Sequence, residues 1–233
     1  MMKTILQQGL TEWGMDQSII PSLETFSHML LEKNQVMNLT AITEPAAVAT
    51  LHLLDSLSLL RVAELSGKSL IDVGTGAGFP GMPIGISQKD IRLTLLDSLQ
   101  KRVDFLQEVC DALQLNQITC VHARAEEFAQ QHRESYDFAT SRAVAALPVL
   151  CELCLPLVKV GGQFLAMKAT DSEEEINSAK AAITLLGGKI RQVVDYTIPT
   201  TDVTHRIICI EKVAPTPKKY PRRFAQIKKQ PLG

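Results

Sequence analysis

Residues 69–81 read Ser-Leu-Ile-Asp-Val-Gly-Thr-Gly-Ala-Gly-Phe-Pro-Gly. A short apolar run that contains an acidic residue passes directly into a loop with glycines at positions 74, 76 and 78. Glycine lets the backbone turn tightly and lets a ligand approach it closely. A dinucleotide fingerprint places its third glycine five residues after the first, but that position is Phe79. The stretch therefore predicts a nucleotide-like ligand without a pyrophosphate, bound where a buried strand ends.

A second acidic residue supports this interpretation. Asp97 ends the next apolar run, 23 residues after Gly74. A carboxylate in that place can accept hydrogen bonds from both ribose hydroxyls. The combination fits S-adenosylmethionine better than NAD, and a glycine-rich turn made only for packing is the alternative. The predicted cofactor residues of this part of the chain are Asp72, Gly74, Gly76, Gly78 and Asp97.

Outward from the loop, short apolar runs alternate with amphipathic stretches. Strands are predicted at 69–73, 92–96, 118–122, 137–141, 163–168, 189–198 and 205–212. Helices or helix-like connections are predicted at 80–88, 100–114, 126–133, 144–160 and 171–186. This alternation is typical of an α/β fold with a mostly parallel, doubly wound sheet. The last two strands follow one another without a helix, so we expect an antiparallel last strand in a seven-stranded sheet.

The rest of the chain divides by composition. Residues 1–65 have helical periodicity and form a predicted N-terminal helical extension, and residues 66–214 form the predicted cofactor-binding domain. Residues 215–233 form a basic tail with six Lys and Arg and no acidic residue, which leaves 18 basic against 25 acidic residues in 1–214. Tyr220 and Phe224 lie among these charges, a pattern suited to phosphate contact and base stacking. A solubilising tail is the alternative.

Composition excludes several classes of protein. The chain has 233 residues, of which 45% are hydrophobic and 21% charged, as in an ordinary globular protein. Asp55 and Arg61 interrupt the most apolar N-terminal run, and the first residues turn polar too early for a signal peptide. Five cysteines, an odd number scattered through apolar segments, indicate reduced thiols. We therefore expect a cytoplasmic protein, neither secreted nor bound to a membrane.

Seven motifs together make the sequence similar to a known family. They are Asn38–Ile42, His52–Ser56, Asp72–Gly81, Leu95–Arg102, Arg124–Glu126, Ser141–Ala143 and Met167–Lys168. Over nearly the whole chain, the sequence resembles the bacterial small-subunit rRNA guanine-N7 methyltransferases, also called glucose-inhibited division protein B. Two departures are conservative: Ala77 stands where many members carry Pro, and Phe79 where others carry Leu.

The resemblance implies a class I methyltransferase fold, Rossmann-like, with S-adenosylmethionine as methyl donor and S-adenosylhomocysteine as product. It implies as target a guanine in the 530 loop of 16S rRNA (guanine 527 in standard rRNA numbering), hence the small ribosomal subunit as partner. It implies Gly74 as a cofactor contact and adds Phe79, Ala125, Glu126 and Arg142 to the expected contacts. For Glu126 the alternative is a carboxylate that only favours a helix N-terminus. We expect a monomer without a metal ion.

Guanine N7 carries a free lone pair, so its methylation needs alignment and exclusion of water rather than an obligatory general base. Two other substrate classes are disfavoured by residues 139–144, Ala-Thr-Ser-Arg-Ala-Val, after the fourth predicted strand. They lack the Asn/Asp-Pro-Pro-aromatic motif of amine methylation and the Cys-Pro pair of cytosine-C5 methylation.

Arg142 and Lys168 end the fourth and fifth predicted strands, where the ligand crevice of an open α/β sheet lies. They are the predicted catalytic residues, able to hold the cofactor, meet guanine O6 or touch phosphate; a surface ion pair is the alternative. The predicted RNA-binding residues are Lys101, Arg102, Lys218, Lys219, Arg222 and Arg223. For Lys101 and Arg102, an ordinary solvated helix face is an equal alternative.

His52, Asp55 and Ser56 share one helix face by their spacing, either as a hydrogen-bonded patch toward the cofactor or as an ordinary surface. Cys151 and Cys154 form a lone pair inside an apolar helix, where packing is favoured over zinc. Two rival functions remain: a methyltransferase acting on a small molecule or protein, and a non-catalytic ribosome-assembly or RNA-binding factor.

Overall fold

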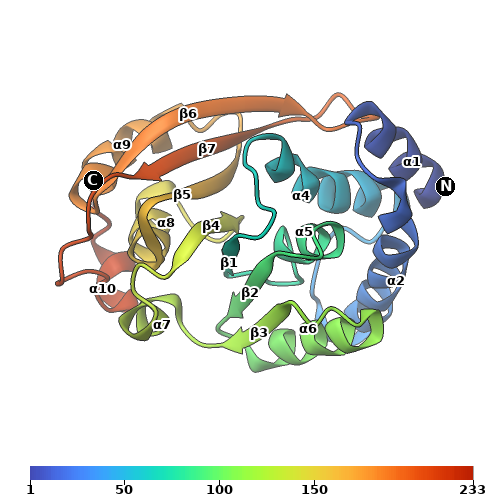
Figure 1. Cartoon of the computed structure of the whole chain (residues 1–233), viewed down its shortest axis with the longest axis horizontal. Coiled ribbons are helices and arrows are strands. Elements are labelled where there is room, and N and C mark those ends of the chain that lie inside the picture. Colours follow the sequence, from blue (N-terminus) through green and yellow to red (C-terminus); the bar gives the residue numbers. More distant parts are fainter. Residues whose placement is uncertain (233) are drawn as a thin grey trace.

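The computed structural model describes residues 1–232 and contains a seven-stranded sheet in the order β3-β2-β1-β4-β5-β7-β6. The strands are β1 (Ser69–Val73), β2 (Arg92–Asp97), β3 (Ile118–His122), β4 (Tyr136–Arg142), β5 (Val158–Ala169), β6 (Gly188–Thr197) and β7 (Thr204–Lys212). Strands β1 to β5 are parallel to one another, whereas β7 is antiparallel to both β5 and β6. The predicted α/β class and antiparallel last strand are confirmed (Figure 1).

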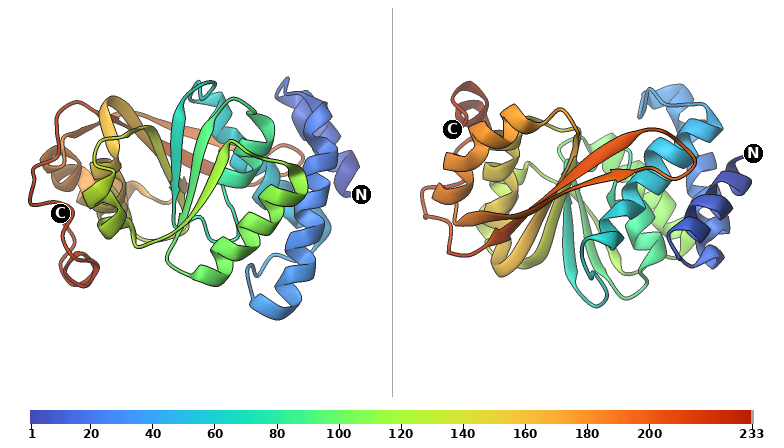
Figure 2. Two further views of the ribbon diagram at one scale, coloured as in Figure 1. Left: turned by 60° about the horizontal axis from the view of Figure 1, so that its bottom comes forward. Right: turned by 90° about the horizontal axis from the view of Figure 1, so that it is seen from above.

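Helices cover both faces of the sheet, so the molecule has three layers (Figure 2). One face carries α1 (Met2–Glu12), α2 (Ile20–Met37), α3 (Pro45–Ala47), the π-helix η2 (Val48–Leu54), α4 (Asp55–Leu57), α5 (Gly81–Ser87) and α6 (Gln100–Leu113), with the short turns η1 (Gln17–Ile19) and η3 (Ser58–Arg61). The other face carries α7 (Ala125–Gln131), α8 (Leu147–Cys154), η4 (Leu155–Leu157), α9 (Glu173–Leu185) and α10 (Phe224–Lys229). Within residues 1–232, none of these helices is long and apolar enough to cross a membrane.

The N-terminal helices share a hydrophobic core with the sheet. Leu23, Phe26 and Leu30 of α2 are fully buried in the same cluster as Leu93 and Leu95 of β2. Burial of this apolar surface stabilises helices and sheet together. The boundary predicted at residue 65 therefore marks a change of secondary structure inside one continuous core.

The helix predicted over 144–160 is shorter in the structure. It starts at Leu147 and ends at Cys154, followed by the turn η4 and then by β5 from Val158. Pro148 stands in the first turn of α8, where its missing N–H is harmless, whereas Pro156 cannot continue a helix interior. Residues 143–146 are left as a loop at the end of β4.

The long β6–β7 hairpin extends across the sheet toward α1 (Figure 1). A Cβ at Gly9 would lie 3.2 Å from Pro199, which shows how closely the helix approaches the hairpin turn. Near this turn the hairpin brings Tyr196 and His205 against Asp55, 141 and 150 residues earlier in the chain.

Candidate active site

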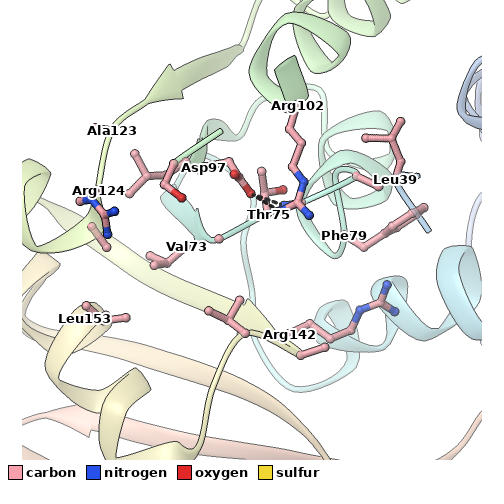
Figure 3. A pocket seen from close by; sticks show the side chains of 18 of the residues that line it. Leu39, Val73, Thr75, Phe79, Asp97, Arg102, Ala123, Arg124, Arg142 and Leu153 are labelled. Atoms are coloured by element: carbon pink, nitrogen blue, oxygen red, sulfur yellow. Dashed lines mark hydrogen bonds and ion pairs between the residues drawn. The ribbon is translucent and has the colours of Figure 1, made fainter. Parts of the chain in front are cut away.

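A cavity of about 450 Å³ lies at the carboxyl ends of β1, β2, β3 and β4 (Figure 3). Parallel α/β sheets place their ligand crevices at this edge. Seven of the nine predicted cofactor residues line the cavity: Gly74, Gly76, Phe79, Asp97, Ala125, Glu126 and Arg142. Residues not predicted for the cofactor also contribute, among them Leu39, Val144, Leu153 and Phe224.

Asp72 and Gly78 do not line the cavity; they contact the glycine loop and the residues packed against it. One carboxylate oxygen of Asp72 accepts hydrogen bonds from Thr75 Oγ1 at 2.7 Å and from the Gly81 amide at 2.8 Å. Burial raises the pKa of Asp72 to about 6, although these two bonds act in the opposite direction. A Cβ at Gly78 would lie 2.9 Å from Leu106. Both residues therefore shape the loop through packing and hydrogen bonds, so their predicted contact with the cofactor gains no support.

The glycine loop contains backbone conformations with positive φ, which residues with a side chain rarely adopt. Gly74 has φ of +72°, and a Cβ there would lie 2.7 Å from Cγ2 of Val144. The Gly76 amide donates to Asp97 at 2.9 Å, which ties the loop to the end of β2. Asp97 also accepts from the Leu99 amide at 2.9 Å and pairs with Arg102 at 3.4 Å (Figure 3). Backbone and one carboxylate thus form this side of the cavity.

A second cavity of about 500 Å³ adjoins the first. The two share His52, Arg142 and Ala143. Its other lining residues come from the loop after α2, the N-terminal helices, β5 and the β6–β7 hairpin: Ile42, Leu51, Asp55, Met167, Lys168, Ala169, Tyr196, Val203 and His205. His52, Arg142 and Ala143 therefore form the wall between the two cavities.

Arg142 is the centre of this wall. Its Nη1 donates to Asp55 at 2.7 Å and to the Leu51 carbonyl at 2.9 Å, and its Nη2 lies 3.0 Å from His52 Nδ1. The guanidinium carbon lies 5.1 Å from the centre of the Phe79 ring, within cation–π range. Contacts on several sides fix the guanidinium between the two cavities.

His52 is held as a neutral ring. Because arginine offers only donors, Nδ1 must accept from Arg142, and Nε2 then donates to Thr40 Oγ1 at 2.8 Å. The ring stacks on Phe79 with a centroid distance of 4.3 Å. Burial and the neighbouring charge of Arg142 lower the pKa of His52 to about 4. The imidazole is therefore uncharged at neutral pH.

Asp55 supports Arg142 from the side away from the first cavity. Its carboxylate, 1% exposed, accepts hydrogen bonds from Tyr196 at 2.6 Å and from His205 at 2.7 Å. Burial opposes ionisation, but the bond from His205 and the charge of Arg142 hold the pKa of Asp55 below its ordinary value. The patch predicted from the spacing of His52 and Asp55 is therefore a network around Arg142. Ser56 is buried and donates to the His52 carbonyl.

The other predicted residues lie in different surroundings. The ammonium of Lys168 contacts the Ala145 carbonyl and the Glu175 carboxylate, both at 2.7 Å, so it also fixes the loop after β4. Arg102 lines the first cavity, whereas Lys101 is exposed at the start of α6. Lys218, Lys219 and Arg223 are exposed. Arg222 instead forms an ion pair with the fully buried Glu152.

Cys151 and Cys154 are buried in α8, and the five cysteines are free thiols. Among the described residues, 1–232, no group of three or more His, Cys, Asp and Glu side chains has the arrangement of a metal site.

Comparison with known sequences decides the family. The family described as "rRNA small subunit methyltransferase G" matches residues 19–204. The chain belongs to this family. A "Ribosomal RNA small subunit methyltransferase G" from Alkaliphilus metalliredigens is 48% identical over 99% of this chain and 98% of the relative. One from Clostridium botulinum is 49% identical over 98% of each, and one from Acetivibrio thermocellus is 44% identical over 99% of this chain and 97% of the relative. The chain is therefore a methyltransferase.

Solved structures support the fold. An O-methyltransferase from Bacillus cereus in complex with SAH superposes with a TM-score of 0.57 at 16% identity, covering 81% of this chain and 91% of that one. TYW2 from M. jannaschii in complex with AdoMet gives a TM-score of 0.55 at 14% identity, covering 68% and 75%. The class I methyltransferase fold implied by the sequence is thus confirmed.

Proposed function

We propose that this chain transfers the methyl group of S-adenosylmethionine to N7 of a guanine in the 530 loop of 16S rRNA, guanine 527 in standard numbering. The observation that carries the proposal is the pair of adjoining cavities that share His52, Arg142 and Ala143. Relatives at nearly half identity over the whole chain bear the name of a small-subunit rRNA methyltransferase.

The residues of the first cavity fit this cofactor. Asp97 presents a carboxylate for the ribose hydroxyls, and Gly74 leaves its wall free of a side chain that would meet Val144. When bound, S-adenosylmethionine supplies an electrophilic methyl group on a sulfonium. The cofactor residues proposed are Gly74, Gly76, Phe79, Asp97, Ala125, Glu126 and Arg142.

The second cavity is the proposed site of the guanine. Arg142 and Lys168 both line it and can donate to guanine O6 or to phosphate, which leaves the N7 lone pair free. His52 is neutral, so the wall between the cavities adds no second positive charge next to Arg142. Methylation at N7 requires no proton removal, and the chain contributes alignment and exclusion of water.

The basic residues at the protein surface are the proposed RNA contacts. Lys101, Lys218, Lys219 and Arg223 are exposed, and Arg102 stands at the rim of the first cavity. Exposed cations contact phosphates and release counterions, so RNA binding should weaken as salt increases. A cytoplasmic location and a monomeric state belong to the same proposal, because ribosomal subunits assemble in the bacterial cytoplasm and one chain supplies all these residues.

Methyl transfer to small ribosomal subunits tests the proposal. Subunits that lack the modification are incubated with the full chain and labelled S-adenosylmethionine, and the RNA is then treated with borohydride and aniline, which cut at N7-methylguanine. We expect label in 16S rRNA and cleavage in the 530 loop. We also expect Arg142→Ala to lower both transfer and cofactor affinity. Label on another nucleotide, on protein or on nothing would refute the proposal.

A further inference from the structure

The C-terminal segment, residues 215–229, is part of the folded core. Thr216, Tyr220 and Ile227 are buried, and the last two belong to the hydrophobic cluster that also contains α8. The basic side chains between them point outward, with the exception of Arg222. Neither a solubilising tail nor a free RNA-binding arm requires such burial.

An internal ion pair anchors this segment. The guanidinium of Arg222 donates to the two carboxylate oxygens of Glu152 at 2.9 and 2.6 Å, and the Arg222 amide donates to the same group at 2.8 Å. Glu152 is fully buried in α8. Arg133 adds bonds to the carbonyls of Tyr220 at 2.7 Å and Pro217 at 3.1 Å. The backbone around residue 222 is thereby fixed against α8 and against the turn that follows α7.

The anchor places an aromatic ring at the first cavity. Phe224, two residues after Arg222, lines this cavity together with Ala125 and Leu153. The guanidinium carbon of Arg124 lies 5.6 Å from the centre of its ring. The ring is half-buried, so part of its surface is available to a ligand.

The position of the second cavity determines which end of the cofactor lies here. The methyl group must face the wall formed by His52 and Arg142, since the acceptor lies beyond it. In S-adenosylmethionine the ribose joins the sulfonium end to the adenine. Asp97, which suits the ribose, lies between Arg142 and Arg124 along the cavity (Figure 3). The adenine ring is then left for the end of the cavity where Phe224 lies.

We propose that Phe224 is a cofactor-binding residue that packs against the adenine of S-adenosylmethionine, and that Arg222 and Glu152 are the positioning residues that hold it there. This inference rests on the proposed cofactor. Aromatic side chains bind purines through their ring faces, a contact that tolerates any base. The basic segment thus has two separate roles, with Arg222 facing inward and Lys218, Lys219 and Arg223 facing outward.

Calorimetric titration with S-adenosylhomocysteine tests the contact. Phe224→Ala should weaken binding about tenfold, the lower part of the range for one base–aromatic stack. Leu232→Ala is the control, since it shortens an apolar side chain just beyond this segment that packs against the same cluster and does not line the cavity, and it should bind like the wild type. Equal affinity of Phe224→Ala and the wild type would overturn the inference. If the wild type itself does not bind, the proposed function fails instead.

A fluorescent reporter distinguishes direct contact from a structural effect. Trp13 is the only tryptophan, so Phe224→Trp in a Trp13→Phe background reports on position 224 alone. We expect S-adenosylhomocysteine and adenosine to change its emission and homocysteine to leave it unchanged. Unchanged emission at saturating S-adenosylhomocysteine would contradict contact with the base.

To test the positioning role, both charges of the Arg222–Glu152 pair have to be removed together. Arg222→Gln alone would leave a buried carboxylate without a partner. The double variant Glu152→Gln, Arg222→Gln should weaken S-adenosylhomocysteine about threefold in the wild-type background and have no further effect in Phe224→Ala, since both changes act through one contact. Equal losses in both backgrounds would show that the pair does not act through Phe224.

Discussion

The glycine loop and the C-terminal segment border the same cavity but are held in place by different forces. Gly74 and Gly76 adopt positive φ, and the loop is tied to β1 and β2 next to it through Asp72 and Asp97. The C-terminal segment is held by an ion pair between residues 70 positions apart, with one partner fully buried. One side of the ligand site is therefore shaped by local backbone geometry. Another side is held by a direct ion pair between residues far apart in the sequence. Each wall should therefore respond to a different kind of substitution.

The largest expected effect concerns the anchor. Arg222→Ala leaves the fully buried Glu152 without a partner and should lower the free energy of unfolding by about 3 kcal/mol. Arg223→Ala, which removes the same charge from the exposed neighbour, should change it by less than about 0.5 kcal/mol. Urea unfolding of the two variants measures the difference. Similar values for both would mean that the segment is not anchored as described.

The glycine loop should respond in ligand affinity. Gly74→Ala forces φ of +72° on alanine and directs its Cβ at Val144, so affinity for S-adenosylhomocysteine should fall by about 2 kcal/mol. Gly161→Ala is the control, because Gly161 has φ of +87° and nothing within 4 Å of its Cβ position. Calorimetry on both variants separates backbone strain from the effect on the cavity. If Gly161→Ala weakened binding as much, the loss in Gly74→Ala would not come from the wall of the cavity.

The outward face of the segment should respond in RNA binding. Replacing Lys218 and Lys219 by alanine should weaken binding to small subunits about tenfold at physiological salt and reduce the salt slope by roughly 1.4–1.8. Affinity for S-adenosylhomocysteine should stay the same, since neither side chain lines the cavity. Filter binding across a salt series provides the test, and an unchanged slope would remove these lysines from the RNA contact.

The smallest effect is the titration of His52. Its pKa is about 4 in the folded chain against 6.5 for an ordinary histidine, so the unfolded chain binds the extra proton between these values. The contribution of His52 to stability is complete above pH 6.5 and is lost as pH falls toward 4, by about 0.7 kcal/mol between pH 7 and pH 6. Asp72, with its pKa raised to about 6, has the opposite trend. The pH dependence of the free energy of unfolding in the wild type and in His52→Asn isolates the contribution of this histidine. If the His52 imidazole titrated near pH 6.5 by NMR, that would contradict its buried, neutral state.

The difference between the two walls also explains what the sequence predicts. The glycines after the first apolar run and the acidic residue at 97 act through the backbone close to them in the sequence. Their spacing therefore predicts both the fold class and this side of the cavity. Arg222 looks like its basic neighbours in the sequence, because its partner Glu152 is identified only by the packing of α8. Tyr196 and His205 carry no motif, and only the β6–β7 hairpin brings them to Asp55.

Calorimetric titration of the full chain with S-adenosylhomocysteine tests the proposed cofactor site most simply. We expect one binding site per chain, and we expect a Gly74→Ala variant to remain folded but to bind far more weakly. Absence of binding to the folded wild-type chain would contradict the claim that the cavity at the glycine loop holds the methyl donor.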